Sequence, residues 1–109
     1  KNDFLTINDK SKLIKIKFDD ILYIETSKRQ LIIHTTNGYE IIKMSMRKLE
    51  KLLNKDFFRC HNSFIVNLEK INKIDVSDIY INNATIPISK HRRKQLKARL
   101  IEVLGDKLC

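Results

Sequence analysis

A basic segment near the end of the chain has the composition of a phosphate-binding site. The segment consists of Ser89, Lys90, His91, Arg92, Arg93 and Lys94. If a helix begins here, the positive end of its macrodipole disfavours each cation by roughly a few tenths of a kcal/mol. A polyanion would offset this cost, because phosphate oxygens accept hydrogen bonds from helix-end N–H groups and from Lys and Arg side chains. The segment therefore predicts a nucleic-acid contact, for which the ordinary alternative is a solvated basic helix face.

A second polar segment lies between two apolar pairs, residues 57–58 and 64–65. Scaffold on both sides predicts a short, rigidly held loop. An asparagine amide can donate to N7 and accept from N6 of adenine, although a capping role explains Asn62 equally well. Cys60 is better explained as a small core residue than as a reactive thiol. The candidate base-reading segment is Arg59, Cys60, His61, Asn62 and Ser63.

A third candidate is the basic tip formed by Lys28, Arg29 and Gln30 between two expected strands. Arginine can bind O6 and N7 of guanine together, and lysine can bind a phosphate. Without the other two segments it would be an ordinary polar turn. We therefore treat it as a DNA contact only in combination with them.

Residues that could support catalysis or hold a metal are few and scattered. Cys60, His34, His61 and His91 form no motif that would assemble a nucleophile, a base and a group to stabilise developing charge. Cys60 and His61 are adjacent, so in an extended segment they point to opposite faces. The chain has no C-x-x-C, no H-x-x-x-H and no Gly-rich phosphate loop. We expect no enzyme activity, no metal and no cofactor.

The charge of the chain favours an anionic partner. Its 109 residues carry 22 Lys and Arg against 13 Asp and Glu, a formal net charge of +9. Nucleic acid is the leading partner, with anionic lipid and an acidic protein surface as alternatives. The length predicts one domain, residues 1–109. The longest apolar run, residues 21–24, is too short to span a bilayer, and Cys60 and Cys109 give no disulfide framework, so we expect a cytoplasmic protein without a membrane partner.

Alternation of apolar and polar residues dominates the middle of the chain and favours antiparallel strands. Asn37-Gly38 and Asn82-Asn83 predict hairpin turns, and Pro87 predicts an edge strand. Phe57 and Phe58 are expected in the core. The expected fold is therefore mainly β. The expected strands are residues 14–18, 21–26, 31–36, 39–43, 63–67, 73–76, 79–81 and 84–88.

Two helices are expected beside these strands. Ser45 is expected to cap a short helix that ends at Asn54, and Ser89 to cap the last helix, with Gly105 as its C′ residue. Helical spacing predicts one apolar face on each helix. The faces are Met46, Leu49, Leu52 and Leu53 on the first, and Leu96, Leu100 and Val103 on the second.

Three stretches together resemble a known family. Residues 57–67 (FFRCHNSFIVN) resemble the signature segment of LytTR DNA-binding domains, nearest to those of AgrA/VirR-type response regulators. Residues 89–94 (SKHRRK) are similar to the family's basic segment before its last helix, and residues 18–25 (FDDILYIE) to its early strand with an acidic turn. The resemblance covers roughly Phe4 to Leu104, nearly the whole chain.

This resemblance implies an elongated, antiparallel β structure with a short internal helix and a C-terminal helix. Loops of such domains enter successive major grooves on one side of a bent duplex. It places base contacts on Arg29, on Asn62, and on His91 or Arg92. The first loop is shorter than in some relatives and carries Arg29 where they have a histidine. It also implies an N-terminal receiver domain in the full-length protein, and paired direct repeats in promoters, in virulence or quorum-sensing regulation.

The sequence thus predicts a sequence-specific, double-stranded DNA-binding domain of a bacterial two-component transcriptional regulator. The alternative is an interaction module that binds an acidic protein or dimerises through Leu96, Leu100 and Val103. RNA binding is less expected, because Tyr23, Tyr39 and Tyr80 lie in expected strands and not among the basic runs.

Overall fold

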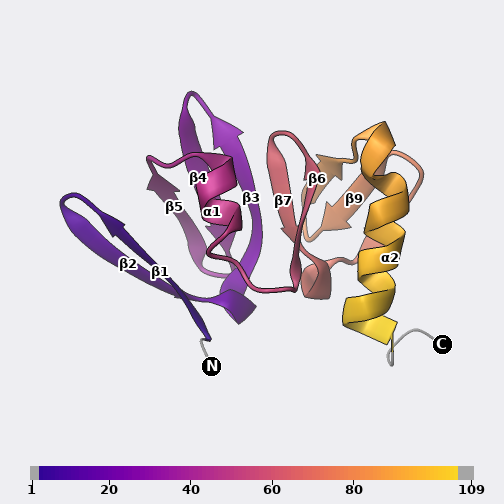
Figure 1. Cartoon of the computed structure of the whole chain (residues 1–109), viewed down its shortest axis with the longest axis horizontal. Helices are drawn as coiled ribbons and strands as arrows, with labels where there is room; N and C mark the ends of the chain where they lie inside the picture. The colour runs from indigo at the N-terminus through magenta and orange to yellow at the C-terminus, as the bar shows by residue number, and fades with distance from the viewer. Residues whose placement is uncertain (1–2, 106–109) are drawn as a thin grey trace.

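The computed structural model describes residues 3–105, which form three antiparallel sheets and two α-helices (Figure 1). The central sheet has five strands in the order β5-β4-β3-β7-β6. Neither of the two smaller sheets pairs with its edge strands. Cys109 lies outside the described residues. The strands of the central sheet are β3 (Ile21–Ser27), β4 (Gln30–Thr35), β5 (Gly38–Ile42), β6 (Phe57–His61) and β7 (Phe64–Asn67).

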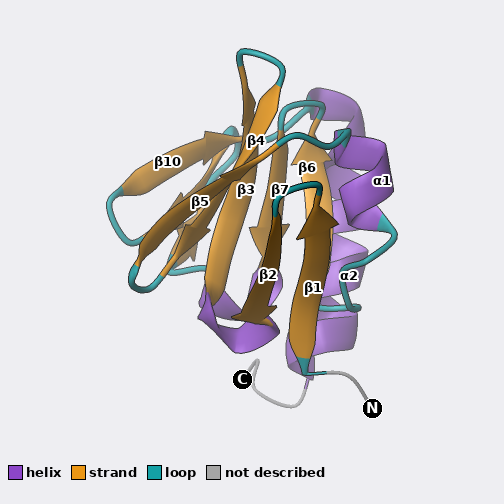
Figure 2. Cartoon of the chain, turned by 90° about the vertical axis from the view of Figure 1, so that its left-hand side faces the viewer, coloured by secondary structure: helices purple, strands orange, loops and turns teal. Residues whose placement is uncertain are grey.

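The remaining elements cover the central sheet. Figure 2 shows the β1–β2 hairpin in front of it and both helices along one side. The mainly β architecture agrees with the sequence prediction. These elements are β1 (Phe4–Asp9) and β2 (Lys12–Lys17), the three-stranded sheet of β8 (Lys73–Ile74), β9 (Asp78–Ile81) and β10 (Ala84–Pro87), and the helices α1 (Met46–Glu50) and α2 (Arg93–Leu104).

Two hydrophobic cores lie on opposite faces of the central sheet. Ile24 and Ile65 face the first core, which β1, β2 and α1 close with residues such as Leu5 and Leu49. Phe58 and Val66 face the second core, which the three-stranded sheet and α2 close. Strand β7 is covered on both faces, which explains its unbroken apolar run. On β6, Phe57 is buried in the first core and Phe58 in the second, as the sequence predicted.

Asn67 ends β7 and is buried with its amide satisfied. Its Nδ2 donates to the carbonyl oxygen of Ile21 at 2.8 Å and to that of Phe18 at 3.4 Å, while its Oδ1 accepts from the backbone N–H of Glu69 at 3.0 Å. This one side chain therefore fixes the start of β3 against the end of β7, which aligns the two strands that carry the first two candidate segments.

The eight expected strands are confirmed within two residues at each end, including β8, which is shortened to Lys73 and Ile74. Strand β1 was not expected, and one expectation is wrong. Residues 59–63 are not a loop: Arg59, Cys60 and His61 belong to β6, with an irregular register between Phe58 and His61. The hairpins at residues 37–38 and 82–83 are confirmed, and Pro87 lies on β10, an edge strand, as expected.

The helices differ from expectation at their ends. Ser45 caps α1, its Oγ accepting from the N–H of Lys48 at 3.1 Å, but α1 ends at Glu50 and Leu52 is 43% exposed. Ser89 precedes a 3₁₀ turn (Lys90–Arg92) and not α2 itself, and its side chain makes no capping hydrogen bond. Gly105 has φ −45°, a right-handed conformation and not that of a C′ glycine. Within residues 3–105, no helix is long and apolar enough to cross a membrane.

Candidate nucleic-acid interface

The three candidate segments lie along the same long side of the molecule. The β3–β4 turn, the β6–β7 turn and the start of α2 all lie at the top of the view in Figure 1. They are spread along the longest axis of the molecule, whose extent is 45 Å. The sheet therefore brings together segments that lie up to about sixty residues apart in the chain, counted from Lys28 to His91.

The first segment is a tight two-residue turn. Ser27 pairs with Gln30, and the turn residues Lys28 and Arg29 have φ of 50° and 66°. Such a turn favours Asn-Gly, because β-carbons are disfavoured at positive φ. Lys28 and Arg29 therefore adopt a sterically strained backbone conformation, and both of their charged side chains are exposed.

The second segment is aligned with the first by main-chain hydrogen bonds. The N–H of Thr26 donates to the carbonyl oxygen of Ser63 at 3.0 Å, and Glu25 pairs with Phe64. Lys28 follows Thr26 by two residues, so the β3–β4 turn extends about 7 Å beyond the β6–β7 turn. The two turns therefore project in parallel from adjacent strands of one sheet.

Arg59 positions the β6–β7 turn. Its Nη2 donates to the carbonyl oxygen of Asn62 at 2.7 Å, and its Nη1 lies 3.6 Å from Oε1 of Glu50 on α1. Asn62 itself is exposed, at the tip of the turn. The structure thus uses Arg59, a predicted contact, to hold the backbone that presents Asn62.

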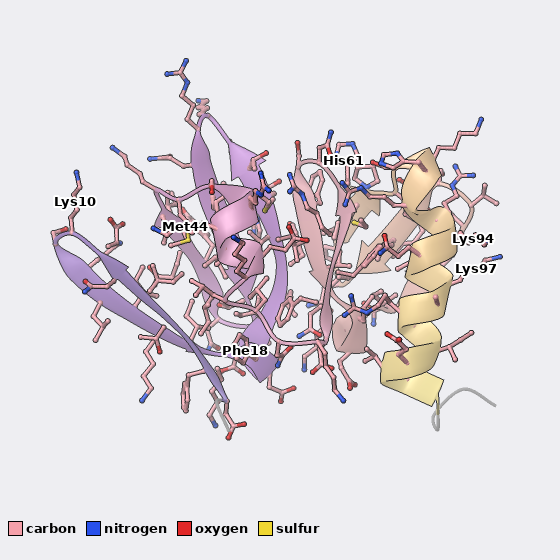
Figure 3. The ribbon with its side chains drawn as sticks, in the orientation of Figure 1. Lys10, Phe18, Met44, His61, Lys94 and Lys97 are labelled. Carbon is pink, nitrogen blue, oxygen red and sulfur yellow. The ribbon has the colours of Figure 1, made fainter. Side chains whose placement is uncertain are left out.

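His61 has a defined ring orientation. Its Nδ1 accepts from the N–H of Ser63 at 3.0 Å, and its ring packs edge-on against Phe64 with centroids 5.7 Å apart. Because Nδ1 is an acceptor, the neutral imidazole carries its proton on Nε2. Figure 3 shows His61 on the side of the molecule that holds the candidate segments, where Nε2 can serve as a donor.

The third segment is joined directly to the second. The N–H of Ser89 donates to the carbonyl oxygen of Cys60 at 2.8 Å. Arg92 donates from Nη1 to the carbonyl oxygen of Arg59 at 2.8 Å and from Nη2 to Oδ1 of Asn62 at 3.4 Å. These contacts make the β6–β7 turn and the 3₁₀ turn one continuous surface, in which Arg92 is shared.

The cations of the third segment occupy two kinds of structure. Lys90 and His91 are exposed in the 3₁₀ turn, whereas Arg93 and Lys94 occupy the first turn of α2. The expectation that the whole run lies in the first turns of the helix is therefore wrong. The macrodipole cost applies to Arg93 and Lys94 alone.

Three arginines of this surface have incompletely satisfied guanidinium groups. The buried Nε atoms of Arg59, Arg92 and Arg93 have no hydrogen-bond partner within residues 3–105. Buried donors without partners and neighbouring like charges are both unfavourable. The fold therefore retains a cationic arrangement that a nearby anion would stabilise.

Cys60 lies beneath this surface and is fully buried. Burial raises the pKa of its thiol to about 12, against smaller opposing effects of a backbone hydrogen bond and of Arg92. The side chain lies in the second core, while the neighbouring His61 is partly exposed. The structure confirms that Cys60 is a core residue, not a partner of the imidazole.

Lysines that the sequence analysis did not single out lie beside the first segment. Lys10, Lys43 and Lys48 line a cavity of about 700 Å³ together with Gln30. Figure 3 shows Lys10 at the β1–β2 turn, pointing toward the side that holds the candidate segments. Lys10 also has a positive φ of 22°. Their distance from one another in sequence hid this group, and only the packing of β1–β2 against β5 and α1 assembles it.

The face expected as an alternative dimer interface is part of the core. Leu96 is 2% exposed, and Leu100 and Val103 pack partly buried against the second core. Leu96 is therefore a core residue, whereas dimerisation through the partly exposed Leu100 and Val103 stays an untested alternative.

A family model described as the LytTr DNA-binding domain matches residues 11–101. Accessory gene regulator protein A of Staphylococcus epidermidis is 32% identical over 85 residues, covering 74% of this chain and 35% of that protein. The protein of the same name from Staphylococcus aureus is 35% identical over 77 residues, covering 67% of this chain and 32% of that protein. The chain thus spans about one third of the length of these curated relatives.

A solved structure shares the fold of most of the chain. It is described as the LytTr DNA-binding domain of a response regulator from Bacillus cereus. The two superpose with a TM-score of 0.75 at 27% sequence identity, over 92% of this chain and 98% of that chain.

Proposed function

Because this chain belongs to the LytTR family of DNA-binding domains, as residues 57–67 and 89–94 indicated, we propose that it reads specific sequences of double-stranded DNA through the three segments along one long side of its β scaffold. The β3–β4 turn, the β6–β7 turn and the 3₁₀ turn before α2 contact base pairs, and the surrounding cations bind phosphates. The domain carries out no reaction on the DNA.

The dimensions of the molecule support reading across successive major grooves. Consecutive major grooves on one side of a duplex are about 34–36 Å apart. The longest extent of the protein is 45 Å, and the candidate segments lie along that axis (Figure 1). The molecule as a whole is therefore longer than the spacing of two consecutive grooves, which agrees with contacts in both.

Three residues are proposed to read bases. Arg29 projects from the first turn and can bind guanine O6 and N7, and Asn62 is exposed for adenine. We assign the third base contact to His91 and not to Arg92. His91 is exposed, whereas Arg92 is already bound to Arg59 and Asn62.

The other candidates are proposed to position the reading residues or to bind phosphate. Arg59 and Arg92 hold the second and third segments together, as their hydrogen bonds indicate. Lys10, Lys43 and Lys48 would add a phosphate contact beside the first turn, because they surround one cavity. The proposed phosphate-binding or supporting residues from the predicted set are Lys28, Gln30, His61, Ser63, Ser89, Lys90, Arg93 and Lys94.

The full-length protein is proposed to be a two-component response regulator with a receiver domain N-terminal to this domain. The length of the curated relatives supports this, since the chain corresponds to about a third of each. Paired direct repeats in promoters and a role in quorum sensing or virulence are proposed from the same relationship. We propose that residues 1–109 form one effector domain.

The observation that carries the proposal is the alignment of three separate polar segments along one long side of a rigid β scaffold. Selection from a random duplex pool, followed by affinity measurements with excess competitor DNA, tests it. We expect one enriched motif, and affinity for it that falls about 10³–10⁵-fold between 50 and 200 mM salt if six to ten phosphates are contacted. Equal affinity for selected and random duplexes would overturn sequence-specific reading.

A further inference from the structure

An apolar groove runs between α2 and the segment joining β8 to β9, and its apolar side chains take no part in the proposed DNA contacts. Its volume is about 620 Å³, within the range of small-molecule sites. Leu96 and Leu100 of α2, Ile88, Ile74 and Val76 form its apolar lining. The helix wall from Arg93 to Leu100 is about 10 Å long at 1.5 Å per residue.

The far wall of the groove holds exposed apolar side chains in place. Val76 is 74% exposed and Ile74 is 37% exposed. The turn that carries Val76 is fixed by Asp75, whose Oδ1 accepts from the N–H groups of Ser77 at 3.1 Å and Asp78 at 2.9 Å. Because these hydrogen bonds already fix the turn, a ligand that covers Val76 does not pay the entropy cost of ordering a mobile loop.

Asp75 is itself occupied, so the far wall offers little free negative charge to the groove. Its Oδ2 accepts from the hydroxyl of Tyr80 at 2.7 Å, and this hydrogen bond with the N–H groups of Asp78 and Ser77 holds the pKa of Asp75 below its ordinary value. The carboxylate is therefore committed to the turn.

The near wall is cationic. Arg93, Lys94 and Lys97 line the groove along α2, and Figure 3 shows Lys94 and Lys97 on the same outward side of the helix. The groove thus combines an apolar lining with positive charge on one wall only. A ligand that satisfies both must be apolar over most of its length and carry an anionic group at one end.

We propose that this groove binds an amphiphilic carboxylate of medium chain length, with its apolar chain against Val76, Leu96 and Leu100 and its carboxylate beside Lys97 and Lys94. A nucleic-acid phosphate does not fit this site, because it would bring no apolar surface to cover the lining. The proposal concerns ligand binding alone and stands whether or not the domain reads specific DNA sequences.

The test uses sodium octanoate as the probe. Acetate, which has the carboxylate without the long chain, and 1-octanol, which has the chain without the carboxylate, are the comparison ligands. Binding is followed by backbone amide NMR on the whole 109-residue chain. We expect saturable octanoate shifts confined to residues 74–76, 88 and 93–100, and affinity at least about tenfold higher than for acetate or octanol. Shifts elsewhere, no saturation, or equal affinity for acetate would overturn the proposal.

Variants separate a specific groove from general surface binding. Val76→Asp places an anion on the apolar wall, and Lys97→Gln removes a cation from the other; each is expected to weaken octanoate binding at least about fivefold. Leu13→Asp is the matched control, because Leu13 is 67% exposed on β2 and lines no part of this groove. Unchanged binding in both groove variants, or an equal loss in the control, would contradict the site.

Discussion

At the scale of single residues, the interface depends on side chains that hold other side chains in position. Asn62 is exposed at the tip of the β6–β7 turn, but its carbonyl oxygen and Oδ1 both accept from arginines. Arg59 and Arg92 therefore fix the orientation of the residue proposed to read a base. Sequence composition marks all three as polar candidates and does not distinguish the residue proposed to read a base from the two that hold its backbone and side chain.

Asn62→Ala is expected to remove discrimination at one base pair. The lost amide hydrogen bonds would cost about 1–3 kcal/mol on the preferred site and little on random DNA. Fluorescence anisotropy on both duplexes measures this. Arg92→Lys is the comparison, since it breaks the bond to Arg59 and should weaken binding to both. Equal losses for Asn62→Ala on the two duplexes would refute its base-reading role.

Cys60 is expected to be chemically inert in the folded protein. Burial raises the pKa of its thiol to about 12, so the reactive thiolate is scarce at pH 7, and the side chain is fully buried. In a Cys109→Ser background, iodoacetamide should label the chain only after denaturation. Rapid labelling of the native state at pH 7 would contradict this assignment.

The raised pKa of the Cys60 thiol also affects stability. The thiol contributes to folding stability below its ordinary pKa of 9.0, and this contribution is lost as pH rises toward the raised pKa.

At the scale of elements, the β3–β4 turn shows a conflict between local preference and proposed function. Lys28 and Arg29 hold positive φ values that Asn-Gly would adopt with less strain. The sequence predicted a polar tip there but not its tightness, because neither residue marks a two-residue turn. Strain of this kind is common at functional sites.

Arg29→Gly is expected to raise stability while weakening DNA binding. Removing the β-carbon relieves about 1–2 kcal/mol of left-handed strain, partly offset by about 0.5–1 kcal/mol of backbone entropy. Thermal unfolding and binding to the selected duplex measure the two effects. Arg29→Ala keeps the strain and removes the guanidinium, so it should lose the same affinity with no gain in stability. A glycine variant that binds DNA normally would show that the turn is only structural.

The β8–β9 turn provides a titratable test of an element. The hydrogen bond from Tyr80 to Asp75 lowers the pKa of Asp75 and raises that of Tyr80. Its contribution is present above the ordinary pKa of the carboxyl, 3.8, and is lost as pH falls through the lowered value. At the other end it is present below 10.0 and is lost as pH rises through the raised phenol pKa.

Asp75→Asn is expected to lower the apparent pKa of one of the three tyrosines. Near-ultraviolet absorbance during alkaline titration follows phenol ionisation, and Tyr80→Phe identifies the transition by removing it. Titration curves of wild type and Asp75→Asn that coincide would contradict the hydrogen bond.

Much of the element pattern was predictable, and the failures have physical causes. Alternation over β3, β4 and β10 reflects strands with one buried face, so their positions follow from the sequence. Strand β6 was missed because Arg59 and His61 interrupt the apolar run next to an irregular register. Helix α1 was predicted too long because helical apolar spacing continues through Leu52, although the helix ends at Glu50 and Leu52 is exposed.

At the scale of the whole molecule, the central claim concerns the arrangement of distant segments. The three sheets and their two cores place Lys28, Asn62 and His91 along one long side, and no local pattern in the sequence specifies this. Each polar segment could be identified from its residues. That the segments share one surface followed only from the family resemblance, and the sheet order now gives the physical reason.

The most direct test of this claim is a base-pair substitution scan of the selected site with wild type and with Arg29→Ala, Asn62→Ala and His91→Ala. Each variant should lose its preference at a different position, and the outermost positions should lie about one helical turn apart, near 10–10.5 base pairs. Loss of preference by all three variants at the same base pair, or uniform weakening at every position, would contradict the proposed reading of DNA by three aligned segments.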